Sequence, residues 1–376
     1  FGTRPEAIKM APVVQEFKKY QDVFLVKVCV TAQHRGMLDQ VLEIFKINPE
    51  YDLNLMKPNQ DLYDITSRAL LKLRAVLNDF KPNVVLVHGD TTTSATASLA
   101  AFYKQIPVGH VEAGLRTGNI YSPWPEEVNR KITGAIATFH FAPTQTSKNN
   151  LIKENIDPSQ IAITGNTVID ALFLASKKIK ENPYLQKEIS TILRKELGEN
   201  FQEILESRYF LVTGHRRENF GDGIINICQA LKQIAMKFPK VSIIYPVHLN
   251  PNVYKPVFKL LSDLDNVHLI NPLSYLPFVF LLEKSYIVLT DSGGLQEEAP
   301  SFGKPVLVMR DTTERPEAIN AGTVKLVGTD KNKIFAEASR LLNDQNYYLS
   351  MAKTHNPYGD GSAAKKIVSF LKKEFQ

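Results

Sequence analysis

The sequence predicts an α/β protein made of two doubly wound, Rossmann-like domains, each built on a parallel sheet. Short β-branched runs that end in polar loops alternate with longer stretches of helical period, which is typical of parallel strands joined by crossover helices. The alternation stops near Val168 and restarts near Tyr209. The chain of 376 residues is also about twice as long as an ordinary domain. We therefore expect one sheet in each half.

Short apolar runs predict the strands of the first half, at 24–30, 84–87, 108–111, 139–141 and 161–164. Stretches of helical period lie at 7–19, 37–45, 62–80, 93–104 and 126–137, and a further helix passes through Leu151. The run at 84–87 is apolar throughout, as expected for a strand that is covered on both faces.

The second half begins with a charged helical connector at 170–208 and then repeats the pattern. Its expected strands are 209–213, 241–246, 267–270, 286–289, 306–309 and 324–326. We divide the chain into an N-terminal domain at 1–169, a C-terminal domain at 170–355 and a final segment at 356–376. The final segment is helical in pattern, and its residues alone allow it to pack on either domain.

Charge and cysteine content narrow the class of protein. The 45 Lys and Arg residues only mildly outnumber the 39 Asp and Glu residues, which suits an anionic ligand but not a nucleic-acid surface. Cys29 and Cys228 lie far apart in apolar settings, which argues against a disulfide framework and a paired-cysteine zinc site. We therefore expect a reducing, cytoplasmic compartment.

The sequence gives no sign of export or membrane insertion. The most apolar stretch, 276–289, is interrupted by Glu283 and Lys284, and no signal-peptide pattern is present. Residues 1–9, FGTRPEAIK, read as the end of a strand followed by a loop and a helix. We therefore expect that some upstream residues are missing from this numbering.

The best-marked anion site is the loop at 290–305, TDSGGLQEEAPSFGKP, which follows an apolar strand. Ser292, Gly293 and Gly294 precede a helix expected to begin near Leu295, so free backbone N–H groups and the positive helix end would face a ligand. Glycine also lets a phosphate approach the backbone closely. The alternative is a tight strand-to-helix turn that simply needs small residues.

The established phosphate-binding signatures are absent from the sequence. Gly303 and Lys304 run into Pro305, so there is no P-loop, and no G-x-G-x-x-G follows a strand. The sequence therefore supports neither a kinase nor a nicotinamide-dependent dehydrogenase.

A second cationic loop, TGHRRENFG at 213–221, also follows a predicted strand. His215, Arg216 and Arg217 place two fixed charges and one titratable ring at that strand end, which suits a pyrophosphate or a leaving group that gains charge. An interdomain salt-bridge cluster is the alternative. None of the eight histidines belongs to a metal-binding motif, and His248, at the end of a later strand, is ambiguous.

Three carboxylates of the first half come from successive loops. Asp90 and Glu112 each lie just past a predicted strand, and Glu126 opens a helix after two prolines, with Arg130 one turn later. A parallel sheet gathers such loops at one edge. Clustered carboxylates repel one another when ionised, which suits one of them to general acid–base chemistry. Each could instead be a helix cap or a first-turn residue.

Eight motifs occur in order along the chain: FGTRPEAIKMAP, VLVHGDTTTS, VGHVEAGLRTG, SPWPEEVNR, TGHRRENFG, YPVHLNPNV, TDSGGLQEEAPSFGKPVLVMRDTTERPEA and NPYGDG. With them the sequence closely resembles the non-hydrolysing bacterial UDP-N-acetylglucosamine 2-epimerases over nearly its whole length. The resemblance implies the glycosyltransferase B architecture, with the active site in an interdomain cleft and the C-terminal helix returning to the first domain. It also implies a homodimer without cofactor or metal.

The family resemblance further implies the reversible conversion of UDP-N-acetylglucosamine into UDP-N-acetylmannosamine, a precursor for cell-surface polysaccharide. UDP is eliminated across C1 and C2, which leaves 2-acetamidoglucal, and is then added back. The resemblance makes Asp90, Glu112 and Glu126 the catalytic carboxylates and His215 the residue facing the diphosphate. The implied substrate contacts are Arg4, Lys9, Arg130, Phe278, Ser292, Gly293, Gly294, Glu298 and Arg315. The residues do not decide which carboxylate takes the C2 proton, and Asp90 is our preference.

Two positions depart from the family pattern. Relatives that are activated by a second UDP-N-acetylglucosamine carry a loop reading Q-H-R-[EQ]-M, whereas Gly36 takes the variable position here. Gln33 and His248 retain the candidate allosteric contacts, so activation could persist in weakened form. Leu273 stands where some relatives have a glutamine.

Other functions stay open at this stage. A hydrolysing 2-epimerase would release UDP and free N-acetylmannosamine, and a glycosyltransferase of the same architecture would transfer the sugar to an acceptor. A catalytically inactive UDP-sugar-binding regulatory protein could dispense with Asp90, Glu112 and Glu126. The presence of all three carboxylates favours the epimerase.

Overall fold

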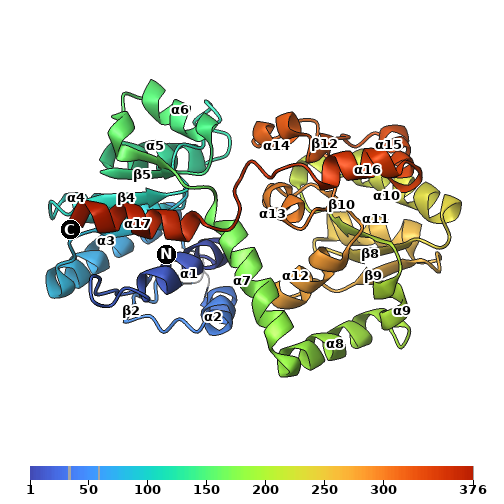
Figure 1. The fold of residues 1–376 in the computed structure, drawn as a ribbon, viewed down its shortest axis with the longest axis horizontal. Helices are drawn as coiled ribbons and strands as arrows, with labels where there is room; N and C mark the ends of the chain where they lie inside the picture. Colours follow the sequence, from blue (N-terminus) through green and yellow to red (C-terminus); the bar gives the residue numbers. More distant parts are fainter. Residues whose placement is uncertain (33–34, 58–59, 376) are drawn as a thin grey trace. The chain divides into compact units, whose positions relative to one another are not determined.

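The computed structural model describes residues 1–32, 35–57 and 60–375. It has the predicted α/β class, with every paired strand of the described residues in a parallel arrangement (Figure 1). The chain forms two compact units. The first contains Phe1–Ala171 and Tyr358–Gln376, and the second contains Leu172–Pro357.

The first unit contains a four-stranded sheet in the order β3-β4-β5-β6 and a separate pair, β1-β2. The strands of the larger sheet are β3 (Val85–His88), β4 (Val108–Val111), β5 (Phe139–Ala142) and β6 (Ile161–Ile163). These bounds agree with the predicted runs to within one residue at each end.

The prediction of a strand at 24–30 was wrong over most of its length. The strand β1 covers only Cys29–Val30 and pairs with β2 (Tyr51–Asp52), which the sequence pattern did not indicate. Just before β1, the backbone N–H of Val28 donates to the Glu50 carboxylate at 2.7 Å rather than to a neighbouring strand. Ladder pairing therefore starts only at Cys29.

The first unit has seven α-helices and one 3₁₀ turn among the described residues. They are α1 (Arg4–Phe17), α2 (Arg35–Ile44), α3 (Leu62–Phe80), α4 (Thr92–Phe102), α5 (Glu126–Ile136), α6 (Gln145–Lys153), η1 (Pro158–Gln160) and α17 (Ala363–Phe375). Helix α1 starts with a capping box, in which the Thr3 hydroxyl accepts from the Glu6 N–H and the Glu6 carboxylate accepts from the Thr3 N–H.

The C-terminal helix α17 completes the core of the first unit. It packs against α1, and Ile367 and Leu371 join Met10, Val13 and Phe17 in one buried apolar cluster (Figure 1). Asp170 stabilises the start of α17, because its carboxylate accepts hydrogen bonds from the N–H groups of Ala363 at 3.2 Å and Ala364 at 2.9 Å. These are two of the N–H groups that have no partner inside the helix.

The second unit is built on a six-stranded sheet in the order β12-β11-β10-β7-β8-β9. Its strands are β7 (Tyr209–Thr213), β8 (Ser242–Pro246), β9 (Val267–Ile270), β10 (Ile287–Thr290), β11 (Val306–Val308) and β12 (Val324–Leu326), close to the predicted runs. Strand order runs outward in opposite directions from the neighbouring pair β7 and β10. The loops after these two strands therefore flank the topological switch point, where open α/β sheets bind ligands.

Helices cover the sheet of the second unit. They are α8 (Pro183–Leu197), α9 (Phe201–Glu206), η2 (Arg217–Asn219), α10 (Asp222–Lys237), α11 (Pro251–Leu261), α12 (Tyr275–Lys284), α13 (Leu295–Ser301), α14 (Pro316–Ala321), α15 (Lys331–Asn343) and α16 (Gln345–Ala352). Helix α7 (Thr167–Glu181) spans the boundary between the two units. As predicted, the charged stretch at 170–208 is helical.

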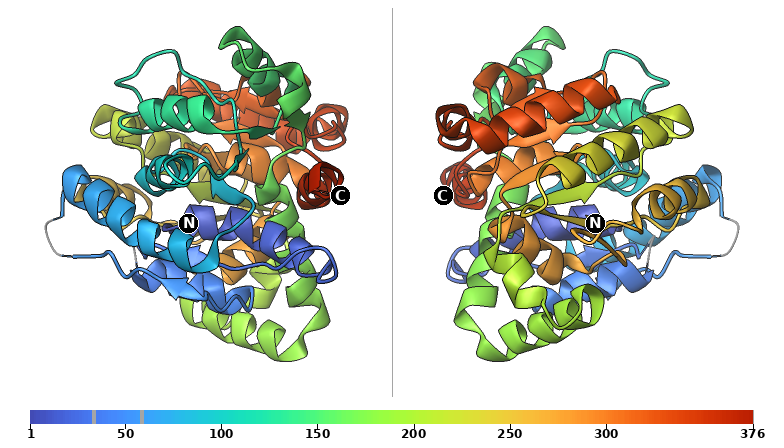
Figure 2. Two further views of the ribbon diagram at one scale, coloured as in Figure 1. Left: turned by 90° about the vertical axis from the view of Figure 1, so that its left-hand side faces the viewer. Right: turned by 90° about the vertical axis from the view of Figure 1, so that its right-hand side faces the viewer.

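One face of this sheet packs against α10, α11 and α15. Alternate strand residues, including Phe210, Ile243 and Leu289, share a buried cluster with Leu231 of α10 and Leu341 of α15. Figure 2, right, shows α10 and α15 side by side, in agreement with their packing contacts. Among the described residues, no helix combines the length and apolarity that crossing a bilayer requires.

Replacing Asp170 by alanine should lower the free energy of unfolding by about 1–2 kcal/mol, because two helix-terminal N–H groups lose their acceptor. Urea denaturation followed by circular dichroism measures the change. Asp360→Ala is the matched control, since Asp360 is exposed near the same helix start. Equal losses in the two variants would contradict a special role of Asp170.

Candidate active site

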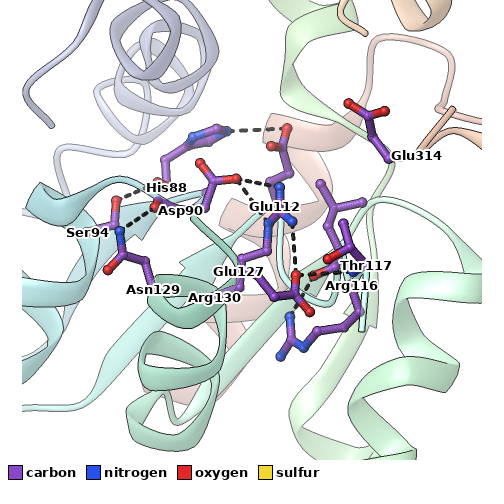
Figure 3. A network of polar contacts seen from close by, with 12 residues as sticks. His88, Asp90, Ser94, Glu112, Arg116, Thr117, Glu127, Asn129, Arg130 and Glu314 are labelled. Carbon is purple, nitrogen blue, oxygen red and sulfur yellow. Dashed lines mark hydrogen bonds and ion pairs between the residues drawn. The ribbon is translucent and has the colours of Figure 1, made fainter. Parts of the chain in front are cut away.

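Polar side chains follow the neighbouring strands β3 and β4 of the first unit. Asp90 lies two residues beyond the end of β3, and Glu112 directly follows β4. The register pairs His88 with Val111, so the two loops leave the sheet next to each other. Figure 3 shows His88, Asp90 and Glu112 together in one network of polar contacts.

Glu112 is buried and held by charged and polar partners. Its backbone φ of 64° lies in the left-handed region, which long side chains rarely adopt and which is often found at functional sites. Its Oε2 atom forms an ion pair with Lys9 and accepts a hydrogen bond from Asn166 Nδ2 at 2.8 Å. The structure thus brings Lys9, an implied substrate contact, to a catalytic candidate.

Two buried histidines lie beside the loops that carry Asp90 and Glu112, and sequence reasoning assigned neither to the site. His88 Nε2 lies 3.7 Å from Glu112 Oε2 and has no hydrogen-bond partner among the described residues. Burial lowers the pKa of His88, against the opposing effect of Glu112. His110 Nε2 lies 2.7 Å from the Gly89 carbonyl oxygen, and burial lowers the pKa of His110 to about 3. The neutral His110 ring therefore donates to the turn that carries Asp90.

Asp90 is fixed by Arg130. Its Oδ2 atom accepts hydrogen bonds from Arg130 Nε at 3.0 Å and Nη2 at 2.7 Å, and its backbone carbonyl accepts from Asn129 Nδ2 at 2.9 Å. Arg130, an implied substrate contact, is largely buried, and its guanidinium already pairs with carboxylates of the chain. In this network Arg130 therefore holds the Asp90 carboxylate in place.

Glu127 is the second carboxylate that Arg130 binds. It is fully buried, and it accepts hydrogen bonds from Arg130 Nη1, from the Thr117 N–H and from the Gly118 N–H, each at 3.1 Å. Glu127 thus connects the loop after β4 to Arg130 and through it to Asp90 (Figure 3). In the sequence Glu127 looked like an ordinary first-turn acid, and its spacing of three from Arg130 was the available signal.

Glu126 and Arg4 complete the candidates of the first unit. Glu126 is the first residue of α5 and lies one turn before Arg130, so both project from one side of the helix. Arg4 is the first residue of α1. Glu6 ties this helix start to the Asp90 loop, because its Oε1 atom accepts from the hydroxyls of Thr91 at 2.7 Å and Ser94 at 3.1 Å.

The second unit places its candidates at the switch point. Strands β7 and β10 end in Thr213 and Thr290, whose hydroxyls are 2.6 Å apart. His215 follows β7, and Asp291 follows β10, with a backbone hydrogen bond from His215 N to Asp291 Oδ2 at 2.9 Å. His215 and the turn at 292–294 therefore come from the loops after these adjacent strands.

Arg315 lies beside the glycine turn. A Cβ atom added to Gly293 would lie 3.5 Å from Arg315 Cζ, and Arg315 Nε donates to the buried Glu297 carboxylate at 2.8 Å. Gly293 is buried, and Ser292 is half-buried. Glu298 is half-buried in the first turn of α13, and Phe278 is half-buried in α12. The Arg315 guanidinium thus lies beside the backbone of Gly293, which carries no side chain.

Of the two candidate allosteric residues, the structure describes only His248. Gln33 lies outside the described residues. His248 is exposed, and its ring stacks on that of His215 with centroids 5.8 Å apart and planes inclined by 24°. At Gly36 an added Cβ atom would meet no described atom within 4 Å, so the missing side chain leaves open space.

Comparisons with known proteins place these loops in a family. Residues 16–372 match the family model described as UDP-N-acetylglucosamine 2-epimerase. The chain is similar to the UDP-N-acetylglucosamine 2-epimerase of Escherichia coli O157:H7, with 59% identity over 99% of this chain and 97% of the relative. The chain belongs to the UDP-N-acetylglucosamine 2-epimerase family.

Further epimerases are similar to this chain in sequence and in structure. The UDP-N-acetylglucosamine 2-epimerase of Campylobacter jejuni is 58% identical over 99% of this chain and 96% of the relative. The crystal structure of the Neisseria meningitidis UDP-N-acetylglucosamine 2-epimerase bound to UDP-N-acetylglucosamine is 56% identical, covers 99% of this chain and 98% of its own, and gives a TM-score of 0.88. The epimerase fold, which is similar to glycosyltransferase B, is therefore that of this chain.

In this member of the epimerase family, Glu127→Gln should lower the free energy of unfolding by about 2–3 kcal/mol. The change leaves the buried Arg130 with one charged partner and weakens the acceptor for the Thr117 and Gly118 N–H groups. Urea denaturation measures it. Glu126→Gln is the neighbouring control, because Glu126 has no hydrogen-bond or ion-pair partner within the described ranges, and it should change stability by less than about 0.5 kcal/mol. Similar losses in both variants would refute the proposed importance of Glu127.

Proposed function

We propose that this chain interconverts UDP-N-acetylglucosamine and UDP-N-acetylmannosamine without net hydrolysis. UDP is eliminated across C1 and C2, 2-acetamidoglucal forms, and UDP is added back after protonation of the opposite face of C2. The observation that carries the proposal is the pair of carboxylates Asp90 and Glu112 at adjacent strand ends, in a chain 59% identical to a UDP-N-acetylglucosamine 2-epimerase.

Inversion at C2 needs a group that removes a proton from one face and a group that returns a proton to the other. We assign removal to Asp90. Arg130 binds only its Oδ2 atom, and within the described part of the chain no donor contacts Oδ1, which leaves that oxygen for the substrate. Glu112 and Glu126 then support Asp90 or supply the opposite face.

The departing UDP must stay bound so that it can recombine with the glycal. We assign this to the second unit. His215, Arg315 and the turn at 292–294 bind the diphosphate, and Glu298 accepts hydrogen bonds from the ribose hydroxyls. Arg4 and Phe278 are proposed as further substrate contacts. The product would supply N-acetylmannosamine units for cell-surface polysaccharide, and we expect the enzyme to act as a homodimer.

With UDP-N-acetylglucosamine in deuterated water, the purified protein should form the manno epimer with deuterium at C2. Proton NMR at C1 and C2 and chromatography of the nucleotides measure both products. Stoichiometric free UDP together with N-acetylmannosamine would instead identify a hydrolysing 2-epimerase. Binding of the nucleotide sugar with no isotope exchange would identify an inactive binding protein.

Asp90→Asn, Glu112→Gln and Glu126→Gln should each lower kcat by at least about 100-fold, because an amide cannot exchange the proton. UDP should bind each variant with nearly unchanged affinity, measured by calorimetry, since the proposal places the UDP contacts mainly in the second unit. Glu154→Gln is the control: Glu154 pairs with Arg116 on the same unit and should be dispensable. Full rates in all three carboxylate variants would refute the assignment.

A further inference from the structure

Asp291 has no role in the function proposed above, yet it is the fully buried residue that directly follows β10 at the switch point. Its Oδ2 atom accepts hydrogen bonds from the backbone N–H groups of His215 and Arg216, both at 2.9 Å, and from Asn219 Nδ2 at 3.2 Å. One carboxylate oxygen thus holds the loop that carries His215.

The other carboxylate oxygen faces the imidazole. Asp291 Oδ1 lies 3.3 Å from His215 Nδ1, and among the described residues this buried oxygen has no hydrogen-bond donor. A buried carboxylate oxygen without a donor is costly. A small rotation of the His215 ring, which is partly exposed, would turn this contact into a hydrogen bond. All three hydrogen bonds that anchor the His215 loop go to Asp291 Oδ2. They do not explain why Oδ1 points at the His215 ring.

We propose that Asp291 is a positioning residue for His215: it orients the ring through Nδ1 and acts as the counter-ion of an imidazolium whose Nε2–H donates to the ligand diphosphate. This inference rests on the proposed function, because it takes UDP as the ligand. A phosphate oxygen only accepts hydrogen bonds, so Nε2 must carry a proton when it faces one. With Nδ1–H directed at Asp291, a proton on both nitrogens makes the ring cationic.

The surroundings of His215 determine when that proton is present. Burial lowers the pKa of His215, Asp291 opposes this effect, and Arg216 and His248 add to it. These three side chains come from the loops after β10, β7 and β8. The lowered pKa of His215 favours its neutral ring in the protein without ligand. A bound diphosphate would add negative charge on the Nε2 side of the ring. Binding of UDP should therefore take up a proton, and affinity should fall as pH rises above neutrality.

The test is calorimetry of UDP binding at pH 7.5 in two buffers with different ionisation enthalpies, which counts the protons taken up. The wild-type protein should take up a proton and His215→Gln should not, and this difference removes the contribution of the phosphate of UDP itself. Equal proton uptake in wild type and His215→Gln would overturn the inference without touching the proposed function. Absence of UDP binding to the wild type would instead refute the proposed function.

The Asp291→Asn variant distinguishes the orientation of the His215 ring by Asp291 from the anchoring of the loop that carries His215. The amide oxygen can still accept from the two backbone N–H groups, but its NH₂ group would face Nδ1 and favour the Nε2–H tautomer of a neutral ring. UDP should bind about tenfold more weakly at pH 7.5, without proton uptake. Nitrogen NMR of the His215 ring should show the changed tautomer and a titration at lower pH.

A double-mutant comparison distinguishes an effect through His215 from loop damage. In the His215→Gln background, Asp291→Asn should weaken UDP binding less than twofold further. Asn219→Ala, which removes a donor from Oδ2 but leaves the charge facing the ring, should keep the proton uptake. Loss of uptake in Asn219→Ala together with an unchanged His215 titration in Asp291→Asn would assign Asp291 to loop structure alone.

Discussion

Parallel pairing of adjacent strands is the constraint on which both candidate sites depend. Strands β3 and β4 in one unit and β7 and β10 in the other end side by side, so the loops that follow them leave each sheet as neighbours. Backbone hydrogen bonds fix this arrangement independently of the loop sequences. Short polar loops can then carry reactive groups, because the sheet has already brought their first residues together.

Buried carboxylates recur as organisers of these loops. Glu127, Asp291 and Glu297 have almost no exposed surface, and each binds backbone N–H groups or an arginine rather than solvent. Asp90, by contrast, retains 26% of its side-chain exposure. The acids that hold the loops are thus distinct from an acid that a ligand could reach. An ionised group is tolerated in the interior when its hydrogen bonds are supplied, as they are for Glu127.

The sequence predicted the fold class and most strand and helix bounds. Apolar runs that are covered on both faces stand out from their surroundings. Helix α3 covers the stretch of helical period predicted for it, and in the structure Asp61 caps its start and Lys81 ends it in the left-handed conformation. Strand β2 has only two residues, too few for a period of two to appear. The false extension of β1 shows that an apolar run does not guarantee a pairing partner.

The candidate site could be predicted from the sequence less completely than the fold. Asp90, Glu112 and His215 could be singled out because they follow predicted strands, and their catalytic roles stay predictions. His88 and His110 lie inside or at the end of strands, where a histidine looks like ordinary core. Glu127 and Asp291 resemble first-turn and turn acids in any α/β protein. Only the tertiary structure shows that they are buried and which side chains they bind.

The place of α17 bears on how the chain folds during synthesis. The second unit is one continuous segment, whereas the first is assembled from the two segments that precede and follow it. Met10, Val13 and Phe17 leave the ribosome before the second unit is made, whereas the residues of α17 that cover them are made after it. The second unit can therefore fold before the first unit is complete. Until then the apolar face of α1 stays uncovered, which makes the nascent first unit the part that most needs protection from aggregation.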